Sequence, residues 1–252
     1  MNNRLIIKKI INKRRIYPLS NVYSLKMVTQ IVSIWENDRG FLFAYNDHGV
    51  TRLGFFVSDW DALDLLLSKI QNGRYYLEYL TKDPIQTLKE LVPVTRMKRL
   101  VNTDCRNVLN DKALICYRND EISSFPNIQD TSEINELLWS VFRPEISHLL
   151  SENELSESIS KGQVTVHKKE KIDAVLMADI MPKKFYINQI VNLGYKGNIH
   201  AMLLYRLTDY IRNGGQYLYA WVDENNIASL KFHAKYGMMH DGMWNLIWTL
   251  AR

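Results

Sequence analysis

Residues 28–101 contain segments with the two-residue hydrophobic period of strands and segments with the 3.6-residue period of helices. Short runs rich in aromatic and branched residues are separated by the polar turns ENDRG and NDHG, which predicts a three-stranded antiparallel meander with strands IVSIW, FLFAY and VTRLGFFV. The run DWDALDLLLSKI then changes to helical spacing, with Ser58 or Asp59 as N-cap. After it we expect a strand at RYYLEYLT, a helix at DPIQTLKELV with Pro84 in its first turn, and a closing strand at TRMKRLV.

From residue 109 onward the predicted strands and helices follow a different order. ALICYR predicts a strand, TSEINELLWSVFR and SENELSESIS predict two helices, and GQVTVHKKE with KIDAVLMADIM predicts an antiparallel pair. Residues 185–237 read as strand FYINQIVNL, basic turn GYKGN, amphipathic helix IHAMLLYRLTDYIRN, strand QYLYAWVDE and short helix IASLKFHAKYG. MHDGMW and LIWTLAR are expected to close the chain as a hairpin.

These patterns predict an α+β protein with a mixed sheet. A polar stretch, NTDCRNVLNDK, marks the expected boundary between a small α+β domain over residues 28–108 and a larger domain over 109–252. Trp244, Ile247 and Trp248 of the last hairpin are expected in the core, and a homodimer contact through them stays open as the alternative.

The formal net charge of +5 is concentrated at one end of the chain. Residues 1–15 hold six basic residues and no acid, with apolar residues at helical spacing, so residues 1–27 are expected to be a basic helical segment. A surface helix packed on its own domain is the simplest interpretation, so nucleic acid is not the expected partner. Binding to nucleic acid or to an anionic surface stays open as an alternative.

Composition excludes several classes of protein. Only Cys105 and Cys116 occur, without pairing motif or zinc spacing, so we expect no metal site and a reducing, cytoplasmic environment. No apolar run approaches the roughly 20 residues that span a bilayer, so no membrane span is expected.

Two segments carry candidate chemistry. Gly194 and Gly197 let the backbone bend closely before a helix whose first N–H groups are free, which suits an anion. Asn226, Ser229 and His233 fall on one side of the last helix and can face a common ligand. The alternative is that Asn226 only caps that helix and His233 is a half-buried surface histidine.

The chain from about residue 112 to 252 resembles the GNAT superfamily of N-acetyltransferases. YKGNIHAMLL is similar to the family's basic, glycine-containing pyrophosphate loop, and NIASLKFHAKYGM to its N-x-x-[AS]-x-x-x-Y-x-K-x-G-F signature. Ile199 and His200 stand where a second glycine of the loop is usual, and His233 stands at the signature tyrosine. Residues 28–108 have the element order of a partial or degenerate second copy.

The resemblance implies acetyl-CoA as co-substrate. It implies that the central strand separates from the next strand and binds the pantetheine arm through its backbone, and that the following loop binds the pyrophosphate. The residues implied in cofactor binding are Ile190, Val191, Asn192, Leu193, Tyr195, Lys196, Gly197, Asn198, Ile199, His200, Ala201, Asn226, Ser229 and Phe232.

It also implies that His233 protonates the departing thiolate. No glutamate lies in the central strand to act as a base, so Asp179, Asp223, Glu224 or a water held by Tyr186 and Asn188 are the candidates. Strand alternation places Tyr186, Asn188, Ile190 and Asn192 on one face and Phe185, Ile187, Gln189, Val191 and Leu193 on the other.

The function expected from the sequence is transfer of an acetyl group to a primary amine of a small molecule or peptide. A fold that binds coenzyme A without catalysis is the alternative from another class. Transfer of a longer acyl chain or an aminoacyl group also remains open.

Overall fold

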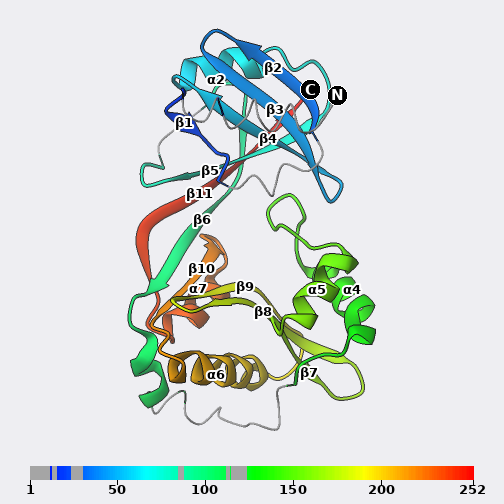
Figure 1. Cartoon of the computed structure of the whole chain (residues 1–252), viewed down its shortest axis with the longest axis vertical. Helices are drawn as coiled ribbons and strands as arrows, with labels where there is room; N and C mark the ends of the chain where they lie inside the picture. The colour runs from blue at the N-terminus through cyan, green and yellow to red at the C-terminus, as the bar shows by residue number, and fades with distance from the viewer. Residues whose placement is uncertain (1–11, 13–15, 24–30, 85–87, 112–113, 115–123) are drawn as a thin grey trace. The chain divides into compact units, whose positions relative to one another are not determined.

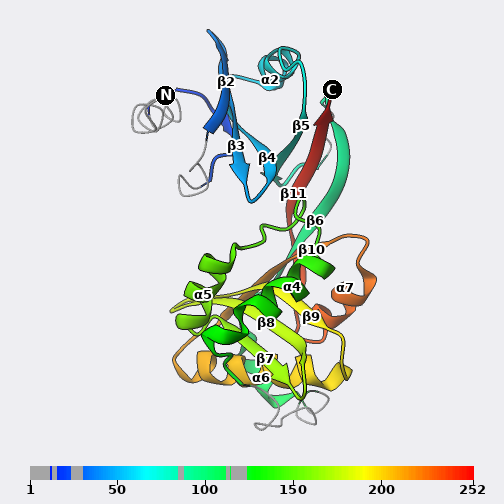
Figure 2. The same ribbon diagram turned by 90° about the vertical axis from the view of Figure 1, so that its right-hand side faces the viewer.

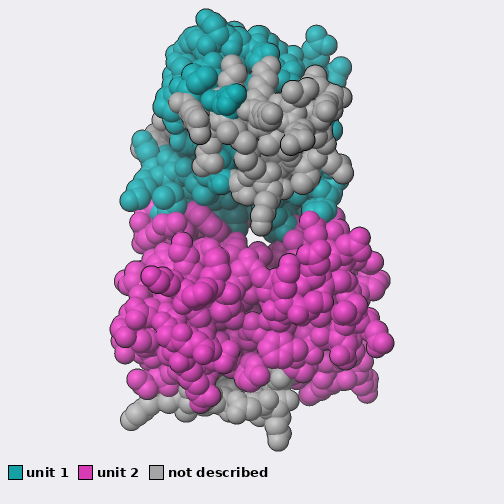
Figure 3. Space-filling view, in the orientation of Figure 1, with its two compact units in different colours: residues 1–97, 144–148, 243–252 teal, residues 98–143, 149–242 magenta. Residues whose placement is uncertain are grey.

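The computed structural model describes residues 12, 16–23, 31–84, 88–111, 114 and 124–252 (Figure 1). The chain forms two compact units that are discontinuous in sequence (Figure 3). Unit 1 comprises residues 1–97, 144–148 and 243–252, and unit 2 comprises residues 98–143 and 149–242. Of the predicted basic segment, all but residue 12 of the first fifteen residues lie outside the described part.

Unit 1 contains the predicted meander. Its elements are β1 (Leu19–Ser20), β2 (Ile31–Asn37), β3 (Gly40–Asp47), β4 (Val50–Val57), α2 (Trp60–Leu67) and β5 (Arg74–Thr81). The β3–β4 turn has positive φ at both His48 and Gly49, which matches the twist of a tight hairpin. Asp59 caps α2 by accepting a hydrogen bond from the Ala62 N–H, and the apolar stripe of α2 packs in the core against β3 and β4.

The helix predicted over residues 83–92 is wrong where it can be seen. Residues 88–91 form turns, and β6 (Val92–Asn102) begins directly after them, while residues 85–87 lie outside the described part. Val92 precedes Pro93, and the proline ring disfavours a helical backbone in the residue before it.

Unit 2 holds a sheet between two layers of helices. Its strand order is β6-β10-β9-β8-β7, and its elements beyond β6 are η2 (Cys105–Asn110), η3 (Ile128–Asp130), α4 (Thr131–Val141), α5 (Glu152–Ser160), β7 (Val164–Lys168), β8 (Ile172–Met181), β9 (Lys184–Asn192), α6 (Lys196–Arg212), β10 (Tyr217–Asp223) and α7 (Ile227–Ala234). Figures 1 and 2 show α6 on one face and α4 and α5 on the other. The predicted helices and strands after residue 131 are confirmed up to α7, whereas the strand expected over 113–118 lies outside the described residues apart from Leu114.

The closing hairpin predicted from the sequence is wrong. Residues 239–251 form a single strand, β11 (Met239–Ala251), which has Gly242 at positive φ but does not reverse there. From Trp244 to Ala251, β11 pairs antiparallel with β5, so its second half belongs to unit 1. Trp248 and Ile247 are buried, which confirms their expected place in the core.

Candidate functional site

The parallel pair β9–β10 stops pairing halfway along. Its ladder runs from Tyr217↔Lys184 to Ala220↔Ile187, and no further pair forms among the described residues. Asn188–Asn192 and Trp221–Asp223 therefore continue beyond the ladder, and we call these two stretches the open end of the β9–β10 ladder. Buried acceptors nearby lack partners, because neither Oε1 of Gln189 nor Oδ1 of Asn192 accepts a hydrogen bond from a described residue. Buried polar groups of this kind call for a partner.

A β-bulge sits at the start of this open end. Met177 of β8 pairs with Gln189 and Ala178 with Ile187, so Asn188 has no residue opposite it. The extra residue reverses the alternation: Ile187 and Ile190 both pack in the core under α6, and Val191 packs in the core under α4 and α5. The prediction that Ile190 shares a face with Tyr186, opposite Ile187, is wrong for this reason.

Three polar side chains form a row across the strands before the bulge. Asp179 of β8 pairs with Tyr186 of β9, which in turn pairs with Tyr219 of β10, and the two rings stack with centroids 4.7 Å apart. The neighbours Phe185 and Ile187 point into the core under α6, so the row lies on the opposite face. Gln163 donates a hydrogen bond to Oδ1 of Asp179, and burial raises the pKa of that carboxyl group.

The helix that follows β9 begins without a side-chain cap or an acid. Lys196 is the first residue of α6, and the Asn198 N–H bonds to the Tyr195 carbonyl, which leaves the N–H groups of Lys196 and Gly197 without a partner among the described residues. Gly197 is buried, and a Cβ on it would lie 2.3 Å from the exposed Tyr195 ring, which would have to move to make room. Lys196 therefore adds a positive charge to the first turn of α6, at the positive end of the helix.

Several residues predicted in this loop are enclosed. Ile199, His200 and Ala201 are buried, and the N–H groups of His200 and Ala201 lie inside α6, so these residues offer a ligand less than the sequence predicted. His200 Nδ1 lies 2.8 Å from the Tyr236 hydroxyl, and its ring packs on Phe232 of α7. Burial, with the Lys235 charge, lowers the pKa of His200 to about 4.

Asn226, Ser229 and His233 are brought together on α7 as the sequence predicted. Asn226 Oδ1 accepts the Ser229 N–H and so caps the helix, while the Ser229 hydroxyl lies 3.3 Å from His233 Nδ1. Asn226 is exposed and Ser229 half-buried, which leaves both accessible. That they bind a cofactor stays a prediction.

His233 is poorly suited to the general-acid role predicted for it. Its side chain is only 3% exposed, and Nδ1 lies 2.7 Å from the Ser229 carbonyl oxygen, which can only accept. Nδ1 is therefore the protonated nitrogen of the neutral ring, and Nε2, buried without a partner among the described residues, holds a lone pair. Burial lowers the pKa of His233 to about 4, so near neutral pH the ring has no proton on Nε2 to give.

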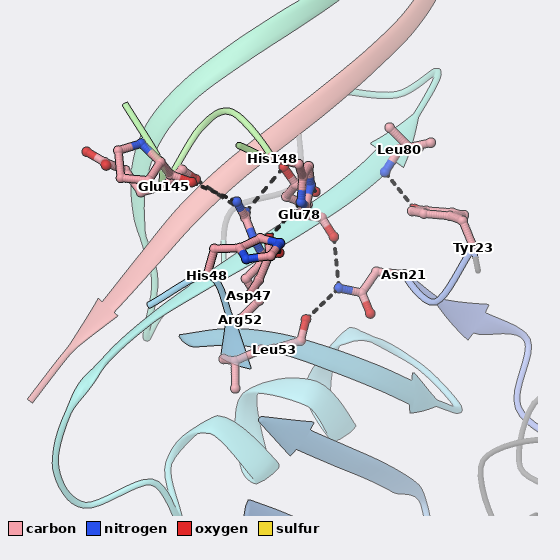
Figure 4. Close-up of polar contacts among 11 residues, drawn as sticks. Asn21, Tyr23, Asp47, His48, Arg52, Leu53, Glu78, Leu80, Glu145 and His148 are labelled. Atoms are coloured by element: carbon pink, nitrogen blue, oxygen red, sulfur yellow. Dashed lines mark hydrogen bonds and ion pairs between the residues drawn. The ribbon is translucent and has the colours of Figure 1, made fainter. Parts of the chain in front are cut away.

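A second polar cluster, which the sequence analysis missed, lies in unit 1 (Figure 4). The guanidinium of Arg52 is buried, pairs with Asp47 and Glu78, and donates to the carbonyls of Pro144 and Glu145. His148 bridges the same two acids, with Nδ1 2.7 Å from Asp47 Oδ2 and Nε2 2.9 Å from Glu78 Oε2. An arginine within the apolar strand VTRLGFFV was the signal, because a buried guanidinium needs acidic partners.

The pKa shifts in this cluster favour the charged forms of His148 and Asp47. Burial alone would lower the pKa of His148, but the Glu78 charge and the hydrogen bonds to Asp47 and Glu78 raise it to about 9. Despite burial, His148 and Arg52 hold the pKa of Asp47 well below its usual range. The cluster fastens residues 144–148 to β4 and β5, and its charges are internally matched, which favours a structural role.

The described residues hold neither a metal-binding cluster nor a membrane-spanning helix. Among the described residues no group of three or more histidine, cysteine, aspartate or glutamate side chains could hold a metal ion. No helix in the described part of the chain is long and apolar enough to cross a bilayer.

Comparison by sequence finds no match to this chain, whereas comparison by structure finds several. No family model and no curated protein matches the chain. Among solved structures, a tandem GNAT protein from the clavulanic acid biosynthesis pathway is 12% identical, with a TM-score of 0.53 over 84% of this chain and 78% of that one. An acetyltransferase from the GNAT family of Colwellia psychrerythraea is 11% identical, with a TM-score of 0.55 over 98% of this chain and 97% of that one.

The chain has the GNAT fold. The likeness covers both units, in keeping with a GNAT-like fold with tandem units. A functionally unknown conserved protein from Staphylococcus epidermidis ATCC 12228 shares the architecture at 9% identity, with a TM-score of 0.55 over 91% of this chain and 98% of that one. At such identities the likeness is one of fold, so the chemistry of this GNAT-fold chain has to be argued from its own residues.

Proposed function

We propose that the chain is an N-acetyltransferase that moves an acetyl group from acetyl-CoA to a primary amine. The observation that carries the proposal is the open end of the β9–β10 ladder beside the uncapped, basic start of α6. Backbone groups beyond the last pair can bind the amides of a pantetheine arm. The N–H groups of Lys196 and Gly197, with the Lys196 ammonium group, can bind a pyrophosphate.

The row of Asp179, Tyr186 and Tyr219 supports an amine as the acceptor. Two stacked aromatic rings beside a half-buried carboxylate attract an ammonium group. The raised pKa of Asp179 brings it nearer the operating pH, which suits a base that takes the first proton from that ammonium. Asp223 is a weaker candidate because it lies beyond the last pair of the β9–β10 ladder, outside the row of Tyr186 and Tyr219.

The reaction then needs no further co-reactant. The free amine attacks the thioester carbonyl, whose oxygen is polarised by a backbone N–H beyond the bulge, near Ile190. A carbon–nitrogen bond forms, the carbon–sulfur bond breaks, and the electron pair leaves on sulfur. The proton lost by the nitrogen ends on that sulfur, so the products are the acetylated amine and free coenzyme A.

Calorimetric titration with acetyl-CoA tests the binding half of the proposal. We expect binding by the wild type, a loss of binding in Lys196→Glu and Gly197→Asp, and unchanged binding in Lys82→Glu, which reverses a charge at an exposed position of unit 1. Binding that survives both site variants would contradict it. Release of coenzyme A with a panel of primary amines tests the transfer, and binding without turnover would favour a non-catalytic module that binds coenzyme A.

A further inference from the structure

Unit 1 repeats the arrangement of the proposed cofactor site. Its strand β4, helix α2 and strand β5 follow one another as β9, α6 and β10 do in unit 2, and β4 and β5 are likewise parallel. Their ladder has only the pairs Arg52↔Tyr76 and Leu53↔Leu77 among the described residues. Gly54–Val57 and Glu78–Thr81 continue beyond it, next to the start of α2, as the open end of the β4–β5 ladder.

The chain's own Asn21 occupies this open end (Figure 4). Its Nδ2 donates to the carbonyl of Leu53 on one strand at 2.8 Å and to the carbonyl of Glu78 on the other at 2.9 Å. Its Oδ1 accepts the Phe55 N–H at 2.8 Å. The side-chain amide thus bridges two separating parallel strands through their backbone groups, as an amide of a bound pantetheine arm would do.

Residues on both sides of Asn21 extend the contact. Leu19 and Ser20, as β1, pair antiparallel with Val57 and Phe56 of β4. On the other strand, the Leu80 N–H donates to the Tyr23 hydroxyl at 2.7 Å. Residues 19–23 therefore satisfy backbone groups of both strands.

The start of α2 is also unlike the start of α6. Asp59 caps α2 through its side chain, and Asp61 adds a second acid in the first turn. Where α6 presents Lys196 and free N–H groups, α2 has the Asp59 carboxylate, which accepts the Ala62 N–H and pairs with Arg39 at 2.6 Å. The place of an anion at this helix start is therefore already taken by a side chain of the chain itself.

We infer that residues 19–23 are a built-in ligand of unit 1, held where the second copy of the fold would otherwise bind a cofactor, so that each chain binds one acyl-CoA, in unit 2. The position of Asn21 and Tyr23 stands on the contacts above. The statement about one cofactor per chain rests on the proposed function.

Hydrogen exchange of single amides tests the built-in ligand without any cofactor. We expect the Leu80 amide to exchange roughly tenfold faster in Tyr23→Phe, which removes only a hydroxyl, while the Phe55 amide is unchanged. In Asn21→Ala the Phe55 amide should respond instead. Unchanged exchange of Leu80 in Tyr23→Phe, or of Phe55 in Asn21→Ala, would overturn the inference.

Titration with acetyl-CoA tests the stoichiometry. One site per chain, abolished by Lys196→Glu, is the expected result. Two sites, or one site that survives Lys196→Glu, would place a cofactor in unit 1 and overturn the inference. If the wild type binds no cofactor, the proposed function fails, and the exchange of Phe55 and Leu80 alone decides whether residues 19–23 fill unit 1.

Discussion

Nδ1 of His233 donates to the carbonyl oxygen of Ser229, one turn earlier in α7, across 2.7 Å. This bond fixes the proton on the nitrogen that faces the helix backbone. We therefore predict that His233→Gln keeps turnover within a few-fold of wild type. A fall on the order of 100-fold would instead restore His233 as the general acid.

Because His233 and His200 are buried, unit 2 should lose stability in acid. The pKa of His233, and that of His200, is about 4 in the folded chain and about 6.5 when unfolded, so the unfolded state binds more protons between these values. Stability is full above about pH 6.5 and falls as pH drops toward 4. Urea unfolding at several pH values should show this slope, reduced in His233→Gln and retained in His240→Gln, which changes an exposed histidine.

His148 should give unit 1 the opposite dependence of stability on pH. Its pKa is raised to about 9 by Glu78 and Asp47, so the charged ring stabilises unit 1 fully below about pH 6.5, and this contribution is lost as pH rises through 9. Protection factors of amides in β4 and β5, that is, exchange rates corrected for intrinsic base catalysis, should fall over that interval. This fall should vanish in His148→Gln and persist in His48→Gln; persistence in both variants would show that another group titrates.

Asp179→Asn should lower kcat/KM on the order of 10² or more for an amine acceptor, with little change in acetyl-CoA affinity. A base must be deprotonated to act, so wild-type activity should fall on the acid side of the raised pKa of Asp179, and the variant should lose that limb of the profile. Asp223→Asn is the matched control. Equal effects of the two substitutions would remove the special role of Asp179.

Trp248→Ala should destabilise unit 1 by about 3–5 kcal/mol, because the indole is buried in the core beneath α2. Met239→Ala, at an exposed position of the same strand, should stay within about 0.5 kcal/mol. Thermal unfolding of both variants measures the difference. A small effect of Trp248→Ala would mean that β11 contributes little to this core.

Local patterns were sufficient for most of unit 2, because periodicity and caps specify each helix and strand from neighbouring residues. The bulge at Asn188 was missed, although the alternation breaks there: Asn188 and Gln189 are both polar, and Ile190 and Val191 are both apolar. That break does not show which residue is extra, which is visible only against β8. MHDGMW and LIWTLAR suggested a hairpin, yet the partner of β11 is β5, more than 160 residues earlier in the chain. Such long-range pairing leaves no local mark.

The candidate site could be predicted only in part, again because local patterns do not show how distant elements pack. The basic loop and Asn226 with Ser229 could be recognised from motifs, whereas the enclosure of His200 and His233 depends on how α6 and α7 pack. Asn21 carried no signal, because one asparagine in a short polar segment has many ordinary explanations. Its role depends on two strands that separate more than 30 residues later.

The path of β11 has a consequence for the order in which the chain is made. Leu246, Trp248 and Leu250 complete the core of unit 1, but they are translated after every residue of unit 2. Unit 1, although most of it is synthesised first, therefore lacks one strand of its sheet until β11 has been made. Until then the edge of β5 that β11 will cover is unpaired and can pair with a wrong strand.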